Sequence, residues 1–134
     1  MPIDLKRSHF GLHLTYDGYG ADFATLNSKK AVLSFLESLV KQLEMKKLIG
    51  PLAVRAKENN FNDPGGYTGF VVVQESHISV HTFPRRRFVS IDAYSCKDYD
   101  FKMAIKFITA YFKVKRKELN IIIRGKKYPT KNLV

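Results

Sequence analysis

The stretch that decides the fold is ESHISVHTFP, residues 75–84, which is followed by a second run, FVSIDAYSC, residues 88–96. Both runs are rich in β-branched and aromatic residues, the composition typical of strands. The segment between them, PRRR at 84–87, opens with the proline expected at a turn. The pattern predicts a β-hairpin.

The register of this hairpin follows from the position of its turn. With the turn centred between Arg85 and Arg86, antiparallel partners have numbers that sum to about 171. We therefore expect Ser76 to face Ser95 and to lie beside Cys96. A hydroxyl and a thiol would then meet across one hairpin.

Hydrophobic patterning on either side predicts two helices and about six strands. Alternation over 10–16 predicts a strand, with a turn or loop at 17–22. Apolar residues at three- and four-residue steps predict a helix from Asn27 or Ser28 to about Lys47, ended by Gly50-Pro51. Further strands are expected at 52–56, 69–74 and 120–124, a loop at 57–66, and a second helix capped by Asp98 or Asp100.

These elements predict an α+β fold, a two-layer sandwich in which a largely antiparallel sheet carries two helices packed on one face. At 134 residues the chain has the usual size of one domain, 1–134. No apolar run approaches the ~20 residues of a membrane helix, and the first seven residues lack the apolar core of a signal peptide. We expect a cytoplasmic protein with no membrane partner.

The net charge of +11 favours contact with a polyanion, because basic residues cluster at 85–87, 113–117 and 126–127. No recognition-helix motif or aromatic RNA-binding signature accompanies these clusters. A solvated basic surface is therefore the preferred interpretation. A basic nucleic-acid-binding module stays as an alternative of another class.

The motif Glu-Ser-His-x-x-x-His-Thr-aromatic-Pro at 75–84, with Cys96 twenty residues after Ser76, resembles the prokaryotic S-adenosylmethionine decarboxylase proenzymes. These proteins cut themselves to make a pyruvoyl cofactor. The resemblance extends upstream to Thr68-Gly69, where the family has Ser-Gly, and to His13-Leu14 and Tyr19.

The resemblance implies that Ser76 attacks the carbonyl of Glu75. Elimination would then release a β chain, 1–75, and leave an α chain, 76–134, that begins with a pyruvoyl group. In the family pattern, Thr68 would supply a hydroxyl that stabilises the oxyanion. His81 would transfer protons during processing. The cofactor would form a Schiff base with the substrate amine without any metal, and Cys96 would donate the proton that replaces carbon dioxide.

Geometry predicts that one chain is not enough for this site. Ser76 and His81 are five residues apart on one strand, so they point to opposite faces and are separated by ~16 Å. Thr68 is also out of reach of Ser76. We expect a homodimer with sites at the interface, in which Ser76 and Cys96 come from one protomer.

Substrate recognition departs from the family pattern at one position. Arg85 stands where the family has a Glu that accepts hydrogen bonds from ribose hydroxyls, and a guanidinium only donates. Two further residues are substrate-binding candidates. Phe61 is either an aromatic plate for a planar ligand or a loop anchor that folds back on the core. Asp17 is either the acidic residue common at this position in the family or a turn-stabilising residue. Lys97 also replaces the family glycine after the cysteine. S-adenosylmethionine is the favoured substrate, with arginine or ornithine as the alternative and an inactive homologue as a further one.

Overall fold

The computed structural model describes residues 9–58 and 65–133, so Phe61 lies outside the described residues. In these ranges the chain forms six strands, three α-helices and two short 3-10 helices. The elements are β1 (Gly11–Tyr19), α1 (Phe23–Leu26), α2 (Lys29–Gln42), β2 (Lys47–Ala56), β3 (Gly66–Val73), β4 (Ser76–Phe83), η1 (Pro84–Arg86), β5 (Phe88–Ser95), α3 (Phe101–Phe112), β6 (Arg116–Arg124) and η2 (Thr130–Asn132).

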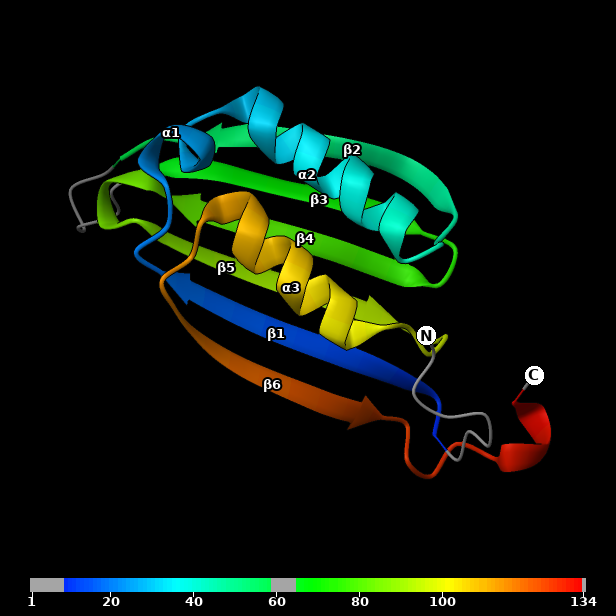
Figure 1. The fold of residues 1–134 in the computed structure, drawn as a ribbon. Helices are drawn as coiled ribbons and strands as arrows, with labels where there is room; N and C mark the ends of the chain where they lie inside the picture. Colours follow the sequence, from blue (N-terminus) through cyan, green and yellow to red (C-terminus); the bar gives the residue numbers. More distant parts are fainter. Residues whose placement is uncertain (1–8, 59–64, 134) are drawn as a thin grey trace.

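The strands form one antiparallel sheet in the order β2-β3-β4-β5-β1-β6. The two long helices, α2 and α3, lie side by side across one face of this sheet, and the described chain places no helix on the other face (Figure 1). We call this second face the open face. The arrangement confirms the predicted two-layer α+β sandwich.

The core lies between the helices and the sheet. Alternate residues of the central strands point toward the helices and are buried, as period-two patterning predicts. The helices contribute the apolar stripes expected at three- and four-residue steps. The fully buried members include Val71, Ile78, Val80, Val89, Ile91 and Ala93 from the sheet, and Val32, Phe35, Leu36, Leu39, Ala104, Ile108 and Phe112 from the helices.

The β4–β5 hairpin has the predicted register. Its turn is η1, closed by Arg87 in the left-handed conformation at φ 51°. Ser76 pairs with Ser95. The prediction that Ser76 and Cys96 lie at the same end of the hairpin is therefore confirmed.

The end of α2 and the course of β2 differ from the prediction. The helix stops at Gln42, and Glu44 takes a left-handed conformation at φ 55°, which turns the chain out of the helix. Strand β2 then begins at Lys47 and runs through Gly50-Pro51, with register shifts on both sides of Ile49. The proline thus interrupts a ladder at the sheet edge and does not end the helix.

Other element boundaries also differ from those predicted. Strand β1 continues to Tyr19, so Asp17 lies inside a strand and the interpretation as a turn residue was wrong. The short helix α1, capped by Asp22, was not predicted. Asp100, and not Asp98, caps α3 by accepting from the backbone N–H of Met103 at 3.0 Å. In the described part of the chain, no helix is long and apolar enough to cross a membrane.

Candidate functional site

The open end of the β4–β5 hairpin holds the peptide bond between Glu75 and Ser76. The backbone N–H of Cys96 donates to the carbonyl oxygen of Glu75 at 2.9 Å, one step beyond the pairing of Ser76 with Ser95. A donor at this position polarises the carbonyl and can stabilise negative charge on its oxygen. The family resemblance implied Thr68 for that task, and the N–H of Cys96 is a donor that was not predicted, although the predicted register implied it.

The turn that carries Glu75 is held by the segment that follows α2. The backbone N–H of Gln74 donates to the Lys46 carbonyl at 2.8 Å. The backbone N–H of Lys46 in turn donates to Glu75 Oε1 at 3.2 Å. Both the backbone and the side chain of the residue before Ser76 are therefore fixed.

Close packing of β1 brings a third strand against the cysteine. A Cβ on Gly11 would lie 2.3 Å from the Ser95 carbonyl oxygen and 3.0 Å from Cys96 Cα, so this position has room only for glycine. The segment after Cys96 is anchored by Tyr99, whose hydroxyl donates to the Ala93 carbonyl at 2.6 Å. Burial raises the pKa of Tyr99.

The second pair of predicted site residues lies at the other end of β4. Thr68 of β3 pairs with His81 of β4, and Thr68 Oγ1 is 3.1 Å from His81 Nδ1. Next to this pair, the backbone N–H of Tyr67 donates to the Thr82 hydroxyl at 2.9 Å. Gly66 allows this approach because a Cβ there, at φ +152°, would lie 1.8 Å from the Thr82 carbonyl oxygen.

The two pairs do not meet within one chain. Ser76 begins β4 and His81 lies five residues further along it, a separation of ~16 Å. Ser76 shares the alternation of the buried Ile78, whereas His81 belongs to the open face. The structure therefore joins Glu75, Ser76 and Cys96 at one end of the strand and Thr68 with His81 at the other.

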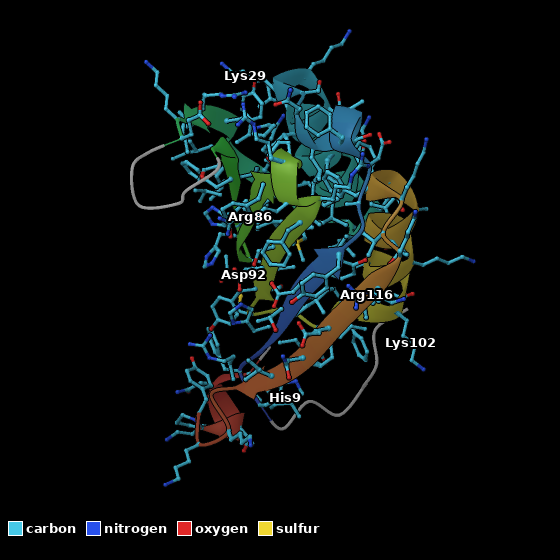
Figure 2. All side chains as sticks on the ribbon, turned by 90° about the vertical axis from the view of Figure 1, so that its left-hand side faces the viewer. His9, Lys29, Arg86, Asp92, Lys102 and Arg116 are labelled. Carbon is cyan, nitrogen blue, oxygen red and sulfur yellow. The ribbon has the colours of Figure 1, made fainter. Side chains whose placement is uncertain are left out.

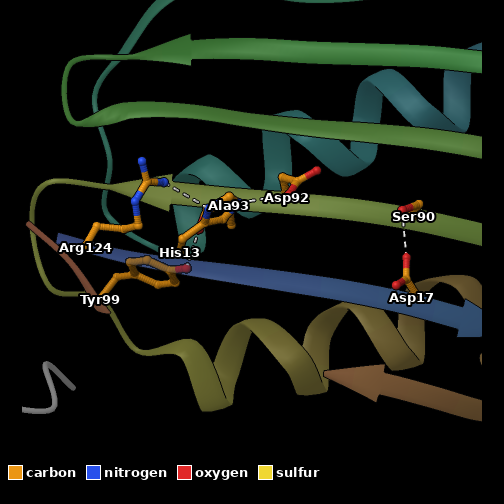
Figure 3. A network of polar contacts seen from close by, with 7 residues as sticks. All are labelled: His13, Asp17, Ser90, Asp92, Ala93, Tyr99 and Arg124. Carbon is orange, nitrogen blue, oxygen red and sulfur yellow. Dashed lines mark hydrogen bonds and ion pairs between the residues drawn. The ribbon is translucent and has the colours of Figure 1, made fainter. Parts of the chain in front are cut away.

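The open face also carries a polar network that the sequence analysis did not predict (Figure 3). Arg124 Nη1 donates to His13 Nδ1 at 3.3 Å, an assignment that leaves Nε2 of His13 to donate to Asp92 Oδ1 at 2.8 Å. Ser90 Oγ donates to Asp17 Oδ1 at 2.7 Å. The available signal was the alternation of β1, which places His13 and Asp17 on the open face.

Asp92 lies on the open face, and Arg86 lies in the β4–β5 turn at one end of the sheet (Figure 2). At this end three aromatic rings lie together. The ring centroids of Tyr19 and Phe88 are 5.1 Å apart, and those of Phe83 and Phe88 are 5.6 Å apart. With Arg86 they line a shallow pocket that a planar group could enter.

Arg85 lies outside this aromatic pocket. Its Nη1 forms an exposed ion pair with Glu58 Oε2 at 3.2 Å, and its side chain lines a small polar pocket with Phe23 and Asn27. Asp17 accepts its hydrogen bond from Ser90 inside the sheet. The structure thus places two of the three substrate-binding candidates, and Phe61 lies outside the described residues.

Comparison with known families gives one match that covers most of the chain. The family model described as S-adenosylmethionine decarboxylase matches residues 12–125. This span includes both pairs of candidate site residues.

Individual relatives agree with the family model. The chain is 38% identical to an S-adenosylmethionine decarboxylase proenzyme of Sulfurihydrogenibium sp., over 86% of this chain and 82% of that protein. It is 34% identical to a proenzyme of the same description from Persephonella marina, over 86% and 82% respectively. The crystal structure of the adenosylmethionine decarboxylase from Aquifex aeolicus superposes with a TM-score of 0.73 at 29% identity, covering 87% of this chain and 92% of that one.

Proposed function

Because this chain belongs to the S-adenosylmethionine decarboxylase family, we propose that it is a self-processing enzyme that decarboxylates S-adenosylmethionine with a pyruvoyl group made from Ser76. Its product would serve polyamine biosynthesis. The observation that carries the proposal is the hydrogen bond from the Cys96 N–H to the Glu75 carbonyl oxygen, directly before Ser76.

Processing would begin with attack of Ser76 Oγ on the Glu75 carbonyl carbon. The peptide C–N bond breaks, the nitrogen of residue 76 takes up a proton, and Glu75 becomes joined to Ser76 through an ester. Negative charge appears on the Glu75 carbonyl oxygen during this step, and the N–H of Cys96 is placed to stabilise it. Thr68 of the partner subunit would supply a second donor.

The second step would be an elimination. A base, for which we propose His81 of the partner subunit, removes the Cα proton of residue 76. The Cβ–Oγ bond breaks, and Glu75 leaves as a carboxylate that ends the chain 1–75. The dehydroalanine left at residue 76 takes up water and loses ammonia, which gives the ketone of the pyruvoyl group.

The residues around Ser76 fit this group. The close approach of Gly11 to Cys96 and the anchoring of Tyr99 fix the cysteine beside the start of β4. When formed, the pyruvoyl group supplies an electron sink for the carbanion left by departing carbon dioxide. We propose that the Cys96 thiol donates the proton that replaces carbon dioxide.

A second copy of the chain would complete the site. The open face presents apolar side chains to solvent, because Leu52, Val54 and Phe70 are 48%, 63% and 38% exposed. Ladder pairing places all three on the same face as Thr68 and His81. A two-fold dimer through this face would bury them and bring the partner's Thr68 and His81 toward the other end of β4, where Cys96 lies.

Two measurements test this function. The purified protein is expected to run on a denaturing gel as chains 1–75 and 76–134, and the α chain is expected to have no free N-terminal amine. Release of carbon dioxide from S-adenosylmethionine, arginine and ornithine would then be measured side by side. Release from S-adenosylmethionine alone supports the proposal, and release only from a free amino acid contradicts the substrate.

A further inference from the structure

The peptide bond proposed to be cut lies inside a ring of hydrogen bonds. On one side, Lys46 accepts from the backbone N–H of Gln74 at 2.8 Å and donates to Glu75 Oε1 at 3.2 Å. All three residues precede the cut. These two bonds would therefore survive cleavage and keep the new C-terminus of the chain 1–75 in its original place.

The other side of the ring crosses the cut. The N–H of Cys96 donates to the Glu75 carbonyl oxygen at 2.9 Å, and Lys97 Nζ donates to the Glu44 carbonyl oxygen at 3.3 Å. After cleavage Glu44 and Glu75 would belong to one chain and Cys96 and Lys97 to the other. Within the described residues, the Lys97 side chain thus ties the α chain to the segment that holds Glu75.

The backbone of Lys97 is itself fixed. Ser95 Oγ accepts from the Lys97 N–H at 2.9 Å and donates to the Lys97 carbonyl oxygen at 2.7 Å. Ser95 is fully buried, whereas Lys97 is exposed. These bonds fix the backbone of Lys97, and the hydrogen bond to the Glu44 carbonyl oxygen holds its ammonium group. Burial does not hold the ammonium group, because the side chain is exposed.

We propose that Lys97 is a positioning residue for self-processing: it holds the segment 44–46, and through it Glu75, while its positive charge favours the carboxylate that leaves in the elimination step. This inference rests on the proposed function. Elimination turns the neutral ester of Glu75 into an anion, so a cation bound to the segment 44–46, which in turn binds Glu75, stabilises the product side of this step more than its start. The preceding transfer from nitrogen to oxygen leaves the carbonyl group of Glu75 uncharged, as an ester, and depends less on Lys97.

The test is a time course of cleavage for protein made in a cell-free translation reaction. Hydroxylamine cuts the ester between Glu75 and Ser76, so the fraction cut by a hydroxylamine pulse reports how much ester is present. For an exposed charge, Lys97→Met is expected to slow cleavage about two- to fivefold, with accumulation of the ester. Lys97→Gly is expected to do the same, Lys97→Arg to cleave like the wild type, and Lys106→Met, an exposed lysine on α3, to change nothing.

The outcomes separate the two proposals. Cleavage of Lys97→Met and Lys97→Gly at the wild-type rate without ester accumulation would overturn the role of Lys97 and leave the proposed function intact. Equal slowing by Lys97→Arg would also overturn it, because the charge would then be irrelevant. Failure of the wild-type chain to cleave at all would overturn the proposed function itself.

Discussion

The backbone N–H of Cys96 lies 2.9 Å from the carbonyl oxygen of Glu75, so a single residue contributes two groups to the site. Its main chain holds the carbonyl that Ser76 is proposed to attack, and its side chain is proposed to protonate the carbanion left by departing carbon dioxide. These two tasks are separable, because a substitution removes the thiol and keeps the N–H.

Cys96→Ala is therefore expected to cleave itself normally but to lose decarboxylase turnover. Loss of a positioned general acid typically lowers the rate by about 10²- to 10⁴-fold. Cleavage is measured on a denaturing gel and turnover by release of carbon dioxide from S-adenosylmethionine. Ser79→Ala, a change of similar size on β4, is the control and is expected to keep both activities. A Cys96→Ala chain that turns over at the wild-type rate would exclude the thiol as proton donor.

The separation of the Ser76 end of β4 from the His81 end leads to a test with mixed chains. Ser76→Ala and His81→Ala are each expected to remain uncut when expressed alone. When the two are expressed together, the dimer brings an intact His81 to an intact Ser76, and the His81→Ala chain is expected to be cut. Different affinity tags on the two chains identify which one is cleaved by mass spectrometry. If the mixture remains uncut while mixed dimers form, His81 does not act across the interface.

Charge at residue 85 is expected to affect substrate binding and not processing. Arg85 is exposed and paired with Glu58, and it stands where the family pattern has an acceptor for ribose hydroxyls. Arg85→Glu is expected to lower KM for S-adenosylmethionine several-fold with little change in kcat and no change in cleavage. Lys106→Glu, the same charge reversal at an exposed position on α3, is the control. An unchanged KM in Arg85→Glu would place residue 85 outside the substrate site.

The hairpin shows how much of the site could be read from the sequence. The position of the turn determined the pairing of Ser76 with Ser95, and parity along β4 placed His81 on the other face, because both depend only on local strand geometry. The bond from Lys97 to Glu44 joins residues 53 positions apart and depends on how α2 ends. No local pattern predicts such a contact.

Two errors in the fold have physical causes of the same kind. Gly50-Pro51 is a strong local breaker, but it lies in an edge strand, where a missing donor and a register shift are tolerated. Asp17 is typical of a turn, but inside β1 its carboxylate finds a donor in Ser90 of the neighbouring strand. In both cases tertiary contacts outweighed local propensity.

Burial of tyrosine predicts a loss of stability at alkaline pH. Burial raises the pKa of Tyr99 in the folded chain above its unfolded value, so the stability contributed by the neutral form is complete below pH ~10 and is lost as pH rises through the folded pKa. Chemical unfolding monitored by circular dichroism between pH 8 and 11 measures this loss. Tyr99→Phe is expected to be about 1 kcal/mol less stable at pH 7, because it loses the bond to the Ala93 carbonyl, and to show a shallower alkaline decline. An unchanged decline would assign the effect to other groups.

The most direct test of the account is the intact mass of the purified wild-type chain beside that of Ser76→Ala. We predict that the wild type separates into chains 1–75 and 76–134, the second beginning with a pyruvoyl group in place of serine, and that Ser76→Ala remains a single chain of 134 residues. A wild-type protein that remains one intact chain and still releases carbon dioxide from S-adenosylmethionine would contradict the account.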